Sequence, residues 1–136
     1  MTRLAIPFLM LCSFLAAAGC KTFLGTSMAE VEKARATALT KTFPVTPVQA
    51  YDAVLAAAAE EKMIVFVKEP ARQAVMLLKA PGCLDTSEIG VFCVQKAPGQ
   101  TQVEISSRSV FARDATAARL FALLTTRFAP PQTAVP

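Results

Sequence analysis

The 136-residue sequence contains no histidine, and this limits the chemistry that the chain can perform. Without histidine there is no Ser–His or Cys–His nucleophile pair, and the commonest general base is missing. Two sets of carboxylates could be considered as acid–base pairs. The neighbours Glu60 and Glu61 are typical of a solvated helix end, and nothing in the sequence singles out Asp85 or Glu88 as a partner of Glu104. Phosphate-binding glycine loops, nucleophile elbows and zinc-protease motifs are absent from the sequence. We therefore expect a non-catalytic protein that needs no cofactor and no metal.

The first 19 residues have the pattern of an export signal. Arg3 provides a short positive region, and Leu4–Ala18 is apolar apart from Ser13. This run is shorter than the roughly 20 apolar residues that a membrane-spanning helix needs. The pattern therefore predicts a signal peptide over Met1–Gly19. Cleavage at an ordinary signal-peptide site after Ala18 is the alternative.

The end of this segment, Ala16–Cys20, resembles the lipobox of bacterial lipoproteins, in which a cysteine follows small residues after an apolar run. It departs from the family preference for leucine at the position of Ala17. The resemblance implies cleavage between Gly19 and Cys20 and a palmitate-type lipid on Cys20, and more than one acyl chain gives stable anchoring. Because Lys21 stands where an aspartate would retain the protein in the inner membrane, the resemblance also implies an outer-membrane anchor facing the periplasm.

Of the four cysteines, this processing would leave Cys83 and Cys93 as an even pair in an oxidising compartment. A bridge between them would stabilise the fold by a little under about 3 kcal/mol on the loop-entropy model. We therefore expect a structural disulfide. A metal or redox role is disfavoured, because two distant cysteines without histidine form neither a zinc motif nor a C-x-x-C pair.

The formal net charge is +4, and the basic side chains are scattered along the chain. A nucleic-acid interface usually shows a basic stripe with interleaved aromatic residues. We therefore expect no nucleic-acid partner.

Residues 20–40 are expected to be a lipidated cysteine followed by a helical tether. Ser27–Glu30 reads as a capping box, and helix-forming residues continue to Leu39. The apolar face of this helix is thin, so the helix is marginal alone. It is interpreted as a spacer, and a partner-binding helix is the alternative.

Residues 41–128 are expected to form one α+β domain, an antiparallel four- to five-stranded sheet with two helices packed on one face. Residues 129–136 are expected to be a flexible tail. The predicted order is β-α-β-β-β-β-α. Its elements are a strand around Phe43, a helix from Pro47 to about Lys62, strands at Met63–Val67, Ala74–Ala80, Glu88–Lys96 and Thr101–Arg108, and a helix capped by Asp114.

Two stretches carry a resemblance at the level of element types. These are Phe43–Leu55, a strand followed by a proline-initiated helix, and Thr101–Leu124, an alternating strand followed by an apolar helix. The order resembles helix-grip domains of small lipoproteins, such as the C-type accessory subunit of the outer-membrane β-barrel assembly machine. It also resembles a group of short bacterial lipoproteins of unknown function.

Two hypotheses about function follow. The first is a membrane-anchored, non-catalytic scaffold or accessory module that binds another envelope protein. The second is a binder of a small apolar ligand such as a lipid, because the strands that carry Phe66 and Phe92 are apolar on both faces. Phe66 and Phe92 could line an apolar groove or an interface. The alternative is that both rings belong to the centre of a buried sheet.

Overall fold

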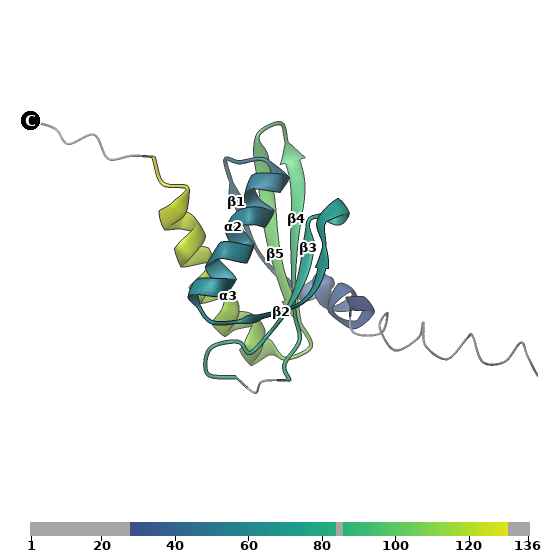
Figure 1. Cartoon of the computed structure of the whole chain (residues 1–136). Coiled ribbons are helices and arrows are strands. Elements are labelled where there is room, and N and C mark those ends of the chain that lie inside the picture. The colour runs from purple at the N-terminus through teal and green to yellow at the C-terminus, as the bar shows by residue number, and fades with distance from the viewer. Residues whose placement is uncertain (1–27, 84–85, 131–136) are drawn as a thin grey trace, which may run out of the picture.

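The structure is a computed structural model that describes residues 28–83 and 86–130. Five strands form one antiparallel sheet with the order β1-β5-β4-β3-β2 (Figure 1). The strands are β1 (Leu39–Phe43), β2 (Ile64–Glu69), β3 (Ala74–Leu78), β4 (Ile89–Ala97) and β5 (Gln100–Ser107). The strands β2 to β5 form a meander joined by short links, whereas β1 pairs with β5 at the other edge. The predicted α+β class and antiparallel sheet are confirmed.

Two helices cover one face of this sheet, as predicted: α2 (Pro47–Glu60) and α3 (Val110–Arg127). Helix α2 begins with the predicted capping box, in which Thr46 and Gln49 each accept from the other's backbone N–H. The helices and the sheet enclose the main core, to which Val54, Ile105 and Leu120 contribute fully buried side chains. We call this side of the sheet the α2/α3 face.

Helix α3 begins five residues earlier than the sequence predicted. Its N-cap is Ser109, whose hydroxyl accepts a hydrogen bond from the backbone N–H of Ala112. The expected cap, Asp114, lies inside the helix and is paired with Arg113 at 2.8 Å. Serine caps helices as well as aspartate does, so residue type alone did not discriminate between the two positions. The correction places Val110 and Phe111 on the first turn of a helix rather than in a loop.

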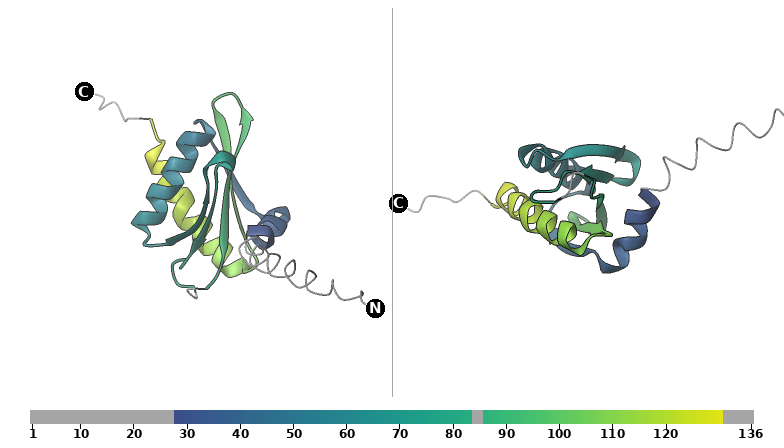
Figure 2. Two further views of the ribbon diagram at one scale, coloured as in Figure 1. Left: turned by 45° about the vertical axis from the view of Figure 1, so that its right-hand side comes forward. Right: turned by 90° about the horizontal axis from the view of Figure 1, so that it is seen from below.

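A helical segment covers the opposite face of the sheet. Residues 28–33 are α-helical and continue into a 3₁₀ helix, η1 (Ala34–Thr37), which leads into β1. Figure 2 shows this segment across the sheet from α2 and α3. Its side chains Met28 and Val31 form a second buried cluster with Ala74, Met76 and Phe92. We call residues 28–37 the N-terminal helix, and we call the side of the sheet that they cover the second face.

Polar contacts fix the N-terminal helix in this position. The buried Ser106 hydroxyl donates to the backbone carbonyl of Val31 at 2.6 Å. The guanidinium of Arg35 pairs with Glu104 at 2.8 Å and lies 4.3 Å from the centre of the Phe92 ring. The segment from residue 28 is therefore part of the folded domain. The predicted spacer role is wrong for residues 28–40, because the alternating polar face of β5 binds this helix instead of facing water.

Strand β2 is the edge of the sheet beyond the N-terminal helix. Its pairing with β3 shifts register between Val65 and Val67, as at a β-bulge. Val65 packs against the main core, whereas Val67 packs against the second cluster. Because strand side chains alternate, Ile64 points to the second face. Bulges, short edges and charged residues are common devices against edge-to-edge aggregation.

Candidate functional site

The structure does not join Cys83 and Cys93, so the predicted disulfide is wrong. Both thiols are free, with Cys93 buried and Cys83 partly buried. Cys93 lies well inside β4, beside Gln73 at the start of β3, whereas Cys83 follows the far end of β3. From Gln73 to Leu78, strand geometry covers roughly 16 Å, more than the about 7 Å limit between the Cα atoms of a bridged pair. The even number of remaining cysteines and the expected oxidising compartment both indicated a bonded pair. Neither observation reports where along a strand each cysteine lies.

Burial raises the pKa of the Cys93 thiol to about 12. Since only the thiolate reacts with alkylating agents, we expect Cys93 to be labelled on the order of 10³-fold more slowly than an ordinary thiol in the native protein. In denaturant without reductant, both thiols should accept label. The measurement is mass spectrometry after iodoacetamide treatment, with a reduced sample as the control. Labelling that requires reductant would show that a disulfide exists after all.

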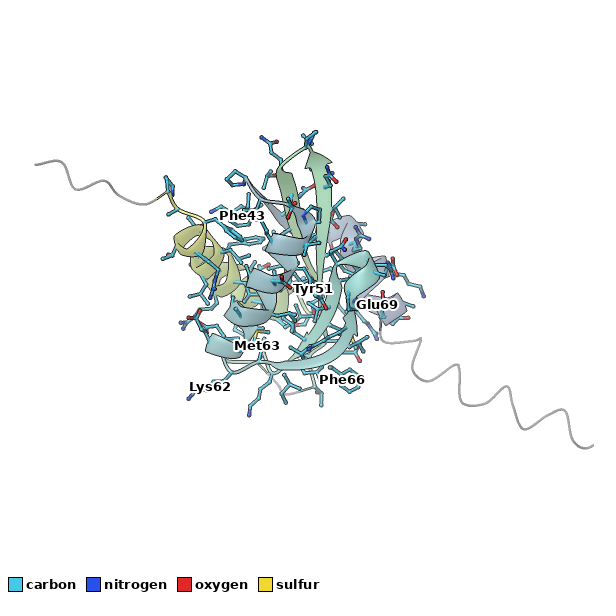
Figure 3. The ribbon with its side chains drawn as sticks, turned by 45° about the horizontal axis from the view of Figure 1, so that its top comes forward. Phe43, Tyr51, Lys62, Met63, Phe66 and Glu69 are labelled. Carbon is cyan, nitrogen blue, oxygen red and sulfur yellow. The ribbon has the colours of Figure 1, made fainter. Side chains whose placement is uncertain are left out.

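The two phenylalanines proposed for a groove lie in different environments. Phe92 is only 2% exposed and belongs to the cluster beneath the N-terminal helix. Phe66 is 53% exposed on the edge strand, and Figure 3 shows it along the rim of the domain with Lys62. The two rings therefore do not line one groove. Phe92 is a core residue, and only Phe66 is available to another molecule.

Phe66 and its strand neighbour Ile64 form the first exposed apolar patch, which we call the β2 patch. Ile64 is 49% exposed, and its strand partner Leu78 is partly buried beside it. Lys62, just before the strand, is exposed. The patch lies at the edge of the second face that the N-terminal helix leaves uncovered.

Val110 and Phe111 form a second exposed patch, which we call the α3 patch. They are 60% and 70% exposed, and Phe111 is the most exposed large apolar side chain among the described residues. They occupy the first turn of α3, a helix that packs on the α2/α3 face, whereas Ile64 of the β2 patch points to the second face. The sequence pattern did not single out this pair, because a helix capped by Asp114 leaves both residues in the preceding loop. The capping potential of Ser109 was the signal that could have found it.

The carboxylates that might have formed an acid–base pair are not brought together. Glu104 is paired with Arg35 and lies opposite Phe92, whereas Glu88 precedes the start of β4. Glu88 and Phe92 are four residues apart along the chain, which corresponds to roughly 13 Å in a strand. This is more than the about 9.5 Å that separates the two carboxyl groups of a glycosidase pair at most. Asp85 lies outside the described residues.

Two open hollows accompany the sheet ends, and neither gathers catalytic groups. The larger, about 440 Å³, is lined by serine, threonine and two charged side chains: Thr86, Ser87, Glu88, Ser107, Arg108 and Ser109. The second, about 370 Å³, lies at the other end between α2 and α3, next to Asp52 and Arg127. Over the described ranges, no group of three or more histidine, cysteine, aspartate or glutamate residues could hold a metal ion.

The predicted cleavage and lipidation positions, Gly19 and Cys20, lie outside the described residues and stay predictions. In the part of the chain that the structure describes, no helix is both long enough and apolar enough to span a bilayer. Comparison with known protein families finds no family model that matches this chain, and comparison with curated proteins finds no matching relative.

Proposed function

We propose that this protein is a lipid-anchored envelope protein that acts by docking and not by catalysis, as a scaffold or accessory module of a periplasmic assembly. The lipobox-like Ala16–Cys20 segment supports the anchor. The observation that carries the docking function is the α3 patch, because its two adjacent side chains, Val110 and Phe111, are the most exposed large apolar side chains among the described residues. Aromatic anchors of this kind dominate binding energy in protein interfaces.

The geometry supports a protein partner for the α3 patch. Ser109 caps the helix and so fixes the backbone from which Val110 and Phe111 project. Arg113, two residues beyond Phe111, donates to the carbonyl of Thr37 at 2.7 Å and ties this turn to the segment before β1. A preorganised aromatic side chain loses little conformational entropy on binding, which favours recognition of a complementary pocket.

The alternative, an apolar ligand held between sheet and helices, receives less support. The doubly apolar strands that suggested it are β2 and β4. Strand β2 is a sheet edge whose Ile64 and Phe66 are about half-exposed, whereas helices cover both faces of β4. Fully buried Val91 and nearly buried Phe92 occupy the two sides of β4. Side chains therefore fill the space that such a ligand would need.

The anchor is tested by replacing the acylated residue. We expect the wild-type protein to carry fatty acid and to sediment with membranes, and Cys20→Ser to lose both. Fractionation of cells labelled with a fatty-acid analogue measures this, and Cys83→Ser is the matched control because it leaves Cys20 in place. A Cys20→Ser protein that still carries fatty acid in the membrane fraction would refute the anchor.

Docking is tested with a photo-crosslinking amino acid placed at single positions in cells. We expect a discrete cross-linked product from position 111 and none from position 48, because Val48 is similarly exposed, at 57%, but lies on the first turn of α2 at the other end of the sheet. A Phe111→Ala variant carrying the crosslinker at 110 should lose most of the product. Equal products from 111 and 48 would contradict docking through the α3 patch.

A further inference from the structure

We infer that the β2 patch is a membrane-contact surface, through which the domain lies against the bilayer that holds its anchor. This inference rests on the proposed lipid anchor at Cys20. It assigns the second exposed apolar patch to an anionic lipid surface and leaves the α3 patch to the protein partner.

The path of the chain places the β2 patch near the membrane. The described chain begins at Met28, which packs in the cluster that also contacts Val67 of β2. The right-hand view of Figure 2 shows this end of the N-terminal helix beside the β2–β3 hairpin. From Cys20 to Met28 a fully extended chain spans at most about 29 Å, so the anchor keeps this end of the domain within that distance of the bilayer surface.

The N-terminal helix makes that placement rigid. It is held to the sheet by Ser106 and by the ion pair of Arg35 with Glu104. Arg72, between β2 and β3, also hydrogen-bonds Glu32 of the helix. The point where the described chain begins is therefore fixed relative to β2, and this favours contact of the β2 side with the lipid.

The chemistry of the patch matches a lipid interface. Ile64 and Phe66 expose about half of their side chains, and the exposed lysines Lys62 and Lys68 flank them along the chain. A third exposed lysine, Lys79, directly follows Leu78, the strand partner of Ile64. Within the described residues, none of these three lysines forms an ion pair. Apolar side chains that enter the headgroup region beside free lysines are the pattern of peripheral attachment to anionic membranes.

The absence of tryptophan from the sequence permits a direct test, since one substitution introduces a single fluorophore. Full-length, processed Phe66→Trp protein is reconstituted in vesicles of phosphatidylethanolamine and phosphatidylglycerol, with or without brominated acyl chains. Val48→Trp, similarly exposed and at the opposite end, is the matched control. Circular dichroism checks that both variants fold.

We expect bromine to reduce the emission of Phe66→Trp by roughly half or more, because interfacial side chains enter about 5–10 Å into the headgroup–acyl boundary. Val48→Trp should be quenched far less. Replacing Lys62 and Lys79 with glutamine in the Phe66→Trp background should weaken the quenching, and so should high salt.

The outcomes separate this inference from the proposed function. Protein that floats with the vesicles but shows equal quenching at both positions overturns the membrane contact and leaves the anchor standing. If the emission of Phe66→Trp shifts as protein density rises but bromine does not quench it, the β2 patch binds a second copy of the chain. That outcome also overturns the membrane contact. Protein that does not float with the vesicles overturns the anchor, and the inference with it.

Discussion

A Phe92→Asp variant is expected to lose about 4 kcal/mol or more of the free energy of unfolding, enough to unfold a domain of ordinary stability. The substitution removes a ring that is 2% exposed and places a carboxylate in the cluster with Val31 and Met76. Arg35 cannot fully compensate this charge, because it is already paired with Glu104. Urea unfolding followed by circular dichroism measures the loss.

Phe66→Asp is the matched control for this prediction. It makes the same change of side chain on another strand of the same sheet, but Phe66 is half-exposed. We expect its cost to stay within about 1 kcal/mol, the range of exposed strand substitutions. If the Phe92 and Phe66 variants unfold at the same urea concentration, Phe92 is not a core residue and the assignment of the second cluster fails.

The contrast between these two rings shows what the sequence could and could not predict. Continuous apolar runs correctly predicted β2 and β4 as strands, and alternation in 101–108 correctly predicted β5. However, an apolar residue on a strand looks the same in sequence whether a helix covers it or not. Phe92 is covered because the N-terminal helix crosses β4, and Phe66 is exposed because that helix does not extend over β2. This difference depends on a contact between segments about 60 residues apart along the chain.

The N-terminal helix was misinterpreted for a related reason. Its thin apolar face, centred on Val31, is too small to stabilise a helix alone, and this favoured a spacer. In the structure the N-terminal helix packs on the sheet, where Ser106 and Glu104 bind its polar groups. In the sequence these two residues belong to an alternating polar pattern that is typical of a solvent-facing strand surface. Local patterns were correct for both elements, while their complementarity became visible only when the two surfaces were brought together.

The site was less predictable than the fold. Two residues were singled out from apolarity alone, and one of them, Phe66, lies on an exposed patch. The α3 patch was missed because the helix start was placed at Asp114 instead of after Ser109. An error of five residues at a helix boundary is enough to assign a helical aromatic side chain to a loop, since caps are specified by short-range hydrogen bonds that several residue types can make.

Gly90→Val is expected to destabilise the domain by about 3 kcal/mol, at the upper end of the range for overpacked cores. A Cβ at Gly90 would lie 2.8 Å from Phe92 Cε2 and 2.9 Å from both Ser106 Oγ and Val31 Cγ2. The glycine therefore lets the N-terminal helix approach the backbone of β4, the role that an isolated glycine in a strand often has. Gly99→Ala is the control, because its Cβ meets nothing within 4 Å and only its left-handed φ of +72° is strained. It should cost about 1 kcal/mol.

The loss in Gly90→Val should concentrate in the N-terminal helix. Gly90 pairs with Met76 and Ser106 through its backbone, which a valine preserves, so the strands can stay paired while the helix is displaced. Hydrogen exchange should therefore speed up in residues 28–37 far more than in β4 and β5. Uniform loss of protection would instead mean that the helix and sheet unfold as one unit.

If only the helix loosens, the link between anchor and β2 becomes flexible, and the same substitution in the Phe66→Trp background should reduce bromine quenching. The close approach at Gly90 would then connect the packing of the second face to the orientation of the domain on the membrane.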